Sequence, residues 1–167
     1  MPSHPALAAG HSAVITGAAS GIGLAAARRF ASMGLKVCLA DLSAEALERA
    51  AAEVAAAAPA GRAAVIAVPT DVSKLESVQA LKDKAYAAFG DVAVLMNNAG
   101  TAPGGGPWDH YERWQRVLGV NLWGVINGVQ TFSPIEAKRR AAARPMPLAA
   151  PVITAARPAA KAGWLGI

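Results

Sequence analysis

The chain has 167 residues, enough for one domain with a sizeable core, and its hydrophobic share of 54% includes many alanines. The sequence contains no run of about 18 apolar residues, the length needed to span a bilayer. The single cysteine, Cys38, excludes a disulfide within the chain and a metal site built from several cysteines. The formal charge of +5 lies wholly in residues 134–167, which hold six Lys and Arg residues and one acid, so a nucleic-acid partner is not expected.

Four short apolar segments alternate with helical patterns along the first 133 residues. The predicted strands are 12–16, 36–41, 63–68 and 92–96, and the predicted helices are 21–33, 44–58, 74–89 and about 109–132. Ser43 and Ser73 are expected to cap the second and third helices. The residues of the first helix that can face the sheet are Ile22, Leu24, Ala25, Phe30 and Met33. Short, continuously apolar strands between helices are typical of a parallel sheet covered on both faces. The sequence therefore predicts an α/β, doubly wound fold.

The alternation stops at Ser133-Pro134, where the composition changes to alanine, proline and arginine. Prolines this frequent prevent a long helix or a central strand, and residues 151–154 are the sole β-like fragment. We therefore divide the chain into an N-terminal extension (1–11), a folded domain (12–133) and a tail (134–167) that we expect to be irregular and disordered. The N-terminal sequence has no basic and apolar leader, so we expect a cytoplasmic setting.

The stretch from Thr16 to Gly23 joins the first strand to the first helix and contains Gly17, Gly21 and Gly23. A strand that ends in glycines and turns straight into a helix points several backbone N–H groups and the positive helix end at one spot. Glycine adopts backbone angles closed to other residues and lets a ligand approach the main chain. This turn, with Ser20 and Ile22, is predicted to hold a pyrophosphate.

Acidic residues follow the next two strands at the same edge of the sheet. Asp41 can accept hydrogen bonds from both hydroxyls of an adenosine ribose, whereas it would repel a 2′-phosphate. Neither Leu42 nor the residues of the glycine turn before Gly21 offer a basic side chain to such a phosphate, so NAD is preferred over NADP. Asp71 could reach the adenine amino group. The alternatives are a solvated loop acid for Asp41 and a helix-capping role for Asp71.

The fourth strand is followed by Asn97-Asn98-Ala99-Gly100, again at the carboxyl edge. Small residues there would let the cofactor ribose lie against the backbone. The alternative is that the two asparagines only stabilise a turn.

Five motifs occur together in order and spacing: Thr16-Gly-x-x-x-Gly-x-Gly23, Asp41, Asp71-Val72, Asn97-Asn-Ala-Gly100 and Val120-Asn121-Leu122. Together they resemble the first half of a short-chain dehydrogenase/reductase, over about residues 10–132. The resemblance implies a Rossmann sheet, an NAD(H) site that includes Val72 and Ala99, and hydride transfer between nicotinamide and an alcohol or carbonyl. It also implies that Asn121 helps to hold a proton-relay water. The alternative for Asn121 is a helix polar residue bonded to backbone.

The residues that perform chemistry in this family are missing from the sequence. The family uses a tyrosine, a lysine four positions later and a serine on the fifth strand, because a phenol is a poor base unless a nearby cation favours the phenolate. Here Tyr86 is followed four positions later by Gly90 and Tyr111 by Gln115, and no serine follows Ser133. We expect no metal and a small alcohol or carbonyl substrate only if a complete form exists.

Three interpretations remain open. The first is a truncated dehydrogenase-like chain, which a shifted reading frame after codon 132 would produce; the second is a non-catalytic dinucleotide-binding or partner module. The third is an unstable fragment, because the fourth strand would be a bare edge and the long helix would expose apolar surface. Self-association is expected in that case.

Overall fold

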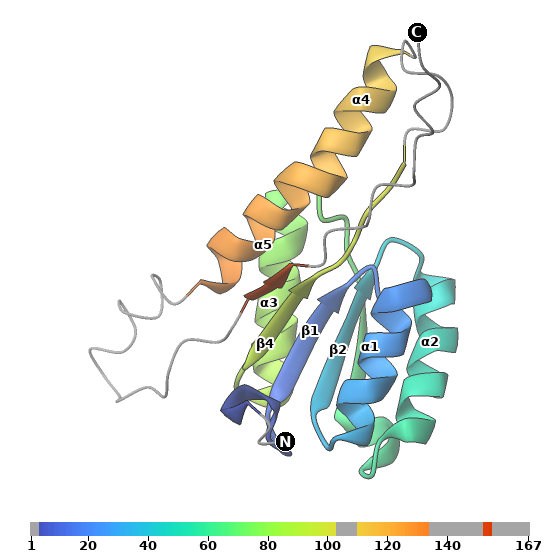
Figure 1. Ribbon diagram of the computed structural model, residues 1–167, viewed down its shortest axis with the longest axis vertical. Helices are drawn as coiled ribbons and strands as arrows, with labels where there is room; N and C mark the ends of the chain where they lie inside the picture. The colour runs from blue at the N-terminus through green and yellow to red at the C-terminus, as the bar shows by residue number, and fades with distance from the viewer. Residues whose placement is uncertain (1–3, 103–109, 134–151, 155–167) are drawn as a thin grey trace, which may run out of the picture.

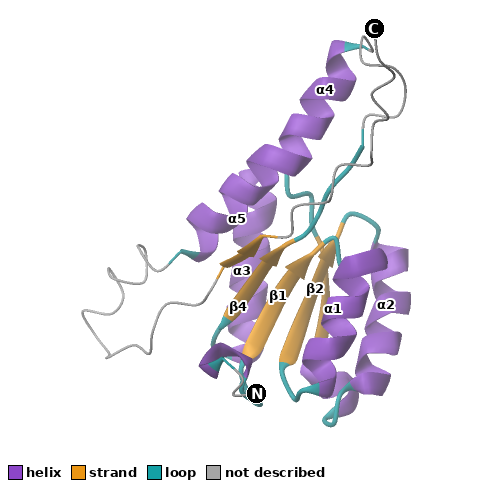
Figure 2. Ribbon diagram, viewed as in Figure 1, coloured by secondary structure: helices purple, strands orange, loops and turns teal. Residues whose placement is uncertain are grey.

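The computed structural model describes residues 4–102, 110–133 and, as a strand only, 152–154. Figures 1 and 2 show one twisted parallel sheet with helices on both faces. The strand order is β3-β2-β1-β4-β5, and every pair is parallel. The strands are β1 (Ser12–Thr16), β2 (Lys36–Asp41), β3 (Val65–Pro69), β4 (Val94–Asn97) and β5 (Val152–Thr154). The predicted doubly wound α/β fold is confirmed.

The α-helices are α1 (Gly21–Ser32), α2 (Ala44–Ala57), α3 (Leu75–Phe89), α4 (Tyr111–Leu118) and α5 (Gly124–Phe132). Short 3-10 helices lie at Pro5–Leu7 and Gly61–Ala64, and a π-helical segment, Gly119–Trp123, joins α4 to α5. The single long helix predicted to end at residue 132 is therefore interrupted by one wide turn. None of the helices in the described ranges is long and apolar enough to cross a membrane.

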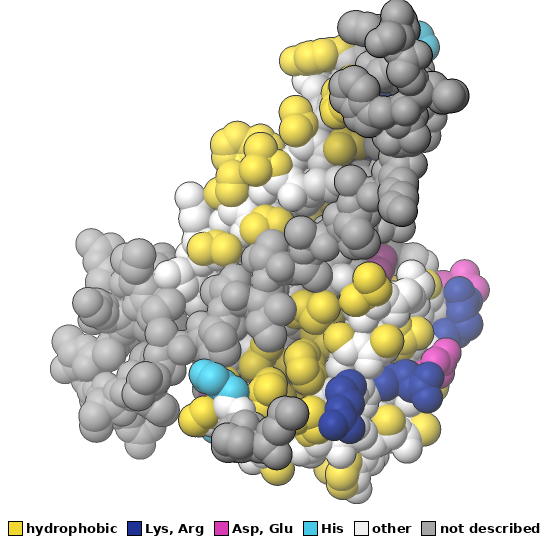
Figure 3. Space-filling view, viewed as in Figure 1, with side chains coloured by type: hydrophobic (Ala, Val, Ile, Leu, Met, Phe, Trp, Pro, Cys, Tyr) yellow, Lys and Arg dark blue, Asp and Glu magenta, His cyan; other side chains and the backbone are white. Residues whose placement is uncertain are grey.

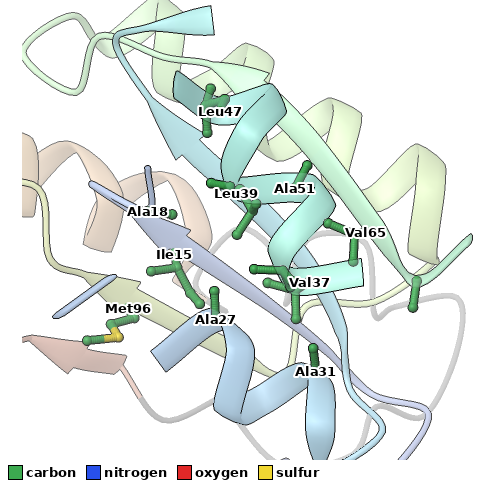
Figure 4. Packing of buried hydrophobic residues seen from close by; sticks show 13 residues of the cluster. Ile15, Ala18, Ala27, Ala31, Val37, Leu39, Leu47, Ala51, Val65 and Met96 are labelled. Carbon is green, nitrogen blue, oxygen red and sulfur yellow. The ribbon is translucent and has the colours of Figure 1, made fainter. Parts of the chain in front are cut away.

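Two apolar layers hold the helices to the sheet. One face carries α1 and α2, packed on Ile15, Val37 and Leu39 (Figure 4). On the other face α3 packs on Val14 and Cys38, and α5 lies beside α3. Burial raises the pKa of the Cys38 thiol to about 12, so this buried cysteine is a core residue and not a reactive one.

The fully buried positions of α1 are small residues, and Leu24 and Phe30 pack against the core beside them. Gly23, Ala27 and Ala31 are buried at intervals of four residues, whereas Ile22 is 59% exposed. The expectation that Ile22 and Ala25 face the sheet was wrong, whereas Leu24, Phe30 and Met33 do pack against the core. The small buried residues let the helix axis come closer to the strands than isoleucine would.

The edge of the sheet also differs from expectation. The sequence predicts a bare edge at the fourth strand, but β5 pairs with β4 from Leu95 to Asn97. A Val-Ile-Thr triplet has strong β-propensity, and β4 offers it unpaired backbone groups. Residues 134–151 and 155–167 lie outside the described ranges, so the predicted disorder of the tail stays a prediction there.

The helical stretch formed by α4 and the π-helical segment carries a row of exposed apolar side chains, as the sequence predicts. Trp114, Leu118 and Leu122 follow one another at helical spacing and are between 43% and 49% exposed. Figure 3 shows hydrophobic atoms gathered along α4 and α5, and Figure 1 shows that α4 extends beyond the sheet. We call these three residues the apolar row.

Candidate functional site

The turn between β1 and α1 is tight because of its glycines. Gly17 and Gly21 have φ angles of 65° and 55°, in the left-handed region that favours glycine. A Cβ on Gly17 would lie 2.7 Å from the Cα of Ala99, and one on Gly23 would lie 2.2 Å from the carbonyl oxygen of Gly17. No other residue fits at Gly17 or Gly23 without moving the backbone.

The start of α1 is open to an anion. Ser20 is the N-cap but makes no side-chain capping bond, and the first turn contains no acid. Ser20, Gly21 and Ile22 are exposed. The first N–H groups of a helix have no partner within the helix, and they carry its positive partial charge.

Thr16 and Asn98 join the glycine turn to the loop after β4. The Thr16 hydroxyl oxygen accepts hydrogen bonds from the backbone N–H groups of Asn98 at 3.0 Å and Ala99 at 3.1 Å. The Asn98 amide Nδ2 donates back to the carbonyls of Thr16 at 3.0 Å and Gly17 at 3.1 Å. Asn98 is thus part of the turn itself. Thr16 bridges the turn to the loop after β4, a role that its position in the sequence does not reveal.

Asp41 ends β2 beside the turn. Its Oδ2 accepts a hydrogen bond from the N–H of Ala19 at 3.1 Å, and its Oδ1 accepts one from the N–H of Leu42 at 2.7 Å. Leu42 is 73% exposed next to it. The carboxylate therefore has a fixed position at the sheet edge, close to the start of α1.

Asp71 is held by the loop that follows β3. Its Oδ1 accepts hydrogen bonds from the hydroxyl of Ser73 at 2.6 Å and the N–H of Ser73 at 3.1 Å. The Ser73 hydroxyl, followed by its N–H and the ammonium of Lys74 at 3.7 Å, lowers the pKa of the Asp71 carboxyl although partial burial opposes this. The prediction that Ser73 caps α3 was wrong: the N-cap is Lys74, and the serine hydroxyl is bonded to Asp71 instead.

Asn121 holds the segment after Gly100 against the long helix. Its Oδ1 accepts from the N–H of Thr101 and its Nδ2 donates to the carbonyl of Thr101, both at 2.8 Å. It lies within the π-helical segment, a geometry that frequently marks functional positions. A Cβ on Gly100 would be 3.6 Å from the Asn121 Oδ1. The interpretation of Asn121 as a helix polar residue bonded to backbone agrees with these contacts.

The strand order brings the predicted residues into one row. Asp71, Asp41, Gly17 and Asn98 lie at or just beyond the carboxyl ends of β3, β2, β1 and β4, which are consecutive neighbours in the sheet. Val72, the residue after Asp71, is buried. In the described part of the chain no group of three His, Cys, Asp or Glu residues could hold a metal ion. The row offers polar backbone, two carboxylates and one helix N-terminus, the groups that a dinucleotide requires.

Comparison with known proteins agrees with this geometry. A family model described as "short chain dehydrogenase" matches residues 11–143. The chain belongs to the short-chain dehydrogenase/reductase family. Among curated relatives, it is 44% identical over 125 residues to 1-deoxy-11-beta-hydroxypentalenate dehydrogenase of Streptomyces exfoliatus, covering 73% of this chain and 44% of that one. It is 46% identical over 121 residues to 3beta-hydroxysteroid dehydrogenase 1 of Eggerthella lenta, covering 71% and 45%.

A solved structure gives the same result for the fold. The short-chain dehydrogenase/reductase of Burkholderia phymatum in complex with NAD superposes with a TM-score of 0.69 at 47% identity, covering 74% of this chain and 43% of that one. The chain thus has the Rossmann-like architecture of this oxidoreductase family, but it spans less than half the length of these relatives.

Proposed function

We propose that the carboxyl edge of the sheet binds NAD, and that these 167 residues bind it without turning over a substrate. The observation that carries the proposal is the pair Gly17 and Gly23, at which any Cβ would collide with backbone at 2.7 Å and 2.2 Å. Such close packing brings the exposed start of α1 to the end of β1. The pyrophosphate would lie there, against the N–H groups of the first helical turn.

The preference for NAD over NADP rests on Asp41. Two backbone N–H groups, those of Ala19 and Leu42, hold its carboxylate at the edge. An ionised carboxylate suits the two ribose hydroxyls and repels a 2′-phosphate. Asp71 and Val72 would lie at the adenine, and Ala99 and Gly100 toward the nicotinamide. The proposed contacts are Gly17, Ser20, Gly21, Ile22, Gly23, Asp41, Leu42, Asp71, Val72, Asn98, Ala99 and Gly100.

Bound NAD would supply a hydride acceptor, and the chain's own residues would only orient it. Both polar groups of the Asn121 side chain are bonded to Thr101, so a relay water at Asn121 would bond to the second Oδ1 lone pair, to the second Nδ2 hydrogen or to the backbone. The sequence contains no Tyr-x-x-x-Lys, and no serine follows Ser133. A proton would therefore have no acid or base of the family's kind to move to. A small alcohol or carbonyl is proposed as substrate only for a form that carries those groups.

The tail is proposed to arise from a shifted reading frame. The abrupt change to alanine, proline and arginine after Ser133 supports this. Translation of the DNA in the other two frames after codon 132 tests it: a serine and a Tyr-x-x-x-Lys are expected in one of them, and their absence from both would contradict the frameshift.

A second candidate, a fragment that associates with itself, is favoured by the apolar row, whose side chains are each more than two-fifths exposed. Calorimetric titration separates the two. Saturable heat with NAD and at least tenfold weaker binding of NADP are expected. Asp41→Asn, which keeps the shape and removes the charge, should reduce that preference. Absence of both heat and thermal shift with NAD would leave only the fragment.

A further inference from the structure

A contact between α5 and the loop that carries Asp71 links two parts of the chain 55 residues apart. The Nδ2 of Asn127 donates a hydrogen bond to the carbonyl oxygen of Val72 at 2.9 Å. Both residues are only 7% exposed. A buried amide that donates to a buried carbonyl in this way is a geometrically demanding contact, because either group left alone would be desolvated without a partner.

The helix comes unusually close to the loop at this point. Gly124 lies one turn before Asn127, on the same side of the helix. A Cβ on Gly124 would be 2.7 Å from the Cγ2 and 3.1 Å from the Cβ of Val72. Glycine therefore permits the approach that brings the short Asn127 side chain within hydrogen-bond distance.

The bonded carbonyl belongs to the same peptide plane as an N–H that holds the candidate adenine ligand. The Val72 carbonyl and the Ser73 N–H lie in one rigid peptide group and point in opposite directions. Asn127 binds the carbonyl end. The N–H end donates to the Asp71 Oδ1 at 3.1 Å. Rotation of this peptide would break both the bond from Asn127 and the bond to the Asp71 carboxylate. Asn127 therefore fixes the orientation of the N–H group that holds Asp71.

Within residues 4–102 and 110–133, the other hydrogen bonds of this loop do not reach α5. The Ser73 hydroxyl donates to the Asp71 carboxylate two residues earlier. The N–H of Asp71 donates to the Ser77 hydroxyl at 3.0 Å, and the N–H of Thr70 donates to the carbonyl oxygen of Asp41 at 2.8 Å. These contacts connect the loop to itself, to α3 and to β2. Asn127 adds a connection to α5, which continues directly from the π-helical segment that contains Asn121.

We propose that Asn127 is a positioning residue for the adenine end of the cofactor site, acting through the Val72–Ser73 peptide on the Asp71 carboxylate. This inference rests on the proposed NAD site. It assigns to Asn127 no contact with the cofactor. Its role is to set the orientation of the group that would accept a hydrogen bond from the adenine amino group.

The test compares NAD with nicotinamide hypoxanthine dinucleotide, which lacks that amino group. Asn127→Leu should weaken NAD about fivefold, the loss of about one hydrogen bond, and leave the hypoxanthine analogue nearly unchanged. Asn127→Ala, which admits water at the Val72 carbonyl, should give the same signature if the leucine variant does not fold. Thr131→Val is the matched control: Thr131 is equally buried on α5, and its hydroxyl has no partner in the described part of the chain.

The outcomes distinguish this inference from the proposed function. An equal loss of both dinucleotides, or no loss of either, would overturn the positioning role while NAD binding stands. Equal affinity of the unchanged chain for both dinucleotides would overturn the role of Asp71 at adenine, and the inference with it. If the unchanged chain binds neither, the proposed function itself fails.

Discussion

Replacement of two glycines in the same turn by alanine should separate close packing from backbone strain. A Cβ at position 23 would lie 2.2 Å from the Gly17 carbonyl oxygen and 2.6 Å from the Asn98 Nδ2. At position 21 nothing lies within 4 Å, but φ is +55°. Gly23→Ala therefore tests whether the turn is packed, and Gly21→Ala tests only the cost of the left-handed conformation.

The two substitutions should lower the free energy of unfolding by different amounts. For Gly23→Ala, overpacking costs about 1–3 kcal/mol, and separation of Asn98 from the Gly17 carbonyl costs about 1 kcal/mol more. The better helix propensity of alanine returns roughly 0.5–1 kcal/mol, which leaves a net loss of about 1–3.5 kcal/mol, with a midpoint of about 2 kcal/mol. For Gly21→Ala, a left-handed residue costs about 1–2 kcal/mol, partly offset by reduced freedom of the unfolded chain, a net loss of about 1 kcal/mol.

Urea unfolding followed by far-ultraviolet circular dichroism measures both variants against the unchanged chain. Gly23→Ala should lower the free energy of unfolding at least twice as much as Gly21→Ala, and it should also weaken NAD binding, because the Gly17 carbonyl and the start of α1 must move apart. Equal losses, or a larger loss for Gly21→Ala, would refute the close-packed turn.

Three further predictions concern neighbouring features. Asp71, whose pKa is lowered in the folded chain, should contribute stability that is complete above its unfolded pKa and lost as the pH falls below about 4. Ser73→Ala should raise the folded-state pKa of Asp71 in a carboxyl NMR titration. An unchanged pKa would contradict the assigned cause. Asn97 and Asn98 should respond oppositely to leucine. The buried Asn97 amide has no partner in the described part of the chain, so Asn97→Leu should stabilise the fold by about 1 kcal/mol. Asn98→Leu should destabilise it by about 2 kcal/mol because it breaks two hydrogen bonds, and shifts of the same sign in thermal unfolding would refute this. Leu118→Gln, in the apolar row, should reduce self-association measured by sedimentation equilibrium. Leu42→Gln, which alters a more exposed leucine outside that row, should not reduce it. A chain that is monomeric without any substitution would contradict the prediction.

Local patterns predicted most of the sheet and the glycine turn. The strands at 12–16 and 36–41 have the predicted bounds, and Ser43 caps α2 by accepting a hydrogen bond from the N–H of Ala46. These features depend on residues close together in the chain, where hydrophobic runs, glycines and capping residues act directly. The resemblance to the family rested on the same local motifs.

Features that depend on distant residues were not predictable in this way. The wide π-helical turn coincides with the bonds of Asn121 to Thr101, 20 residues earlier, and the hydroxyl of Ser73 is bonded to Asp71 instead of capping α3. The pairing of β5 with β4 brings together segments more than 50 residues apart. Asn127 was not predicted either, although an asparagine within the apolar run 122–129 is a pattern that calls for a buried partner.

The most direct test of NAD binding at the carboxyl edge is a titration of the nitrogen-labelled chain with NAD, followed by two-dimensional NMR of the backbone amides. The largest shifts are predicted at Gly17, Ser20–Gly23, Asp41 and Leu42, Asp71 and Val72, and Asn98–Gly100, with little change at Tyr111–Leu118. No shifts at millimolar NAD, or shifts confined to residues away from the ends of β1 to β4, would contradict the proposed site.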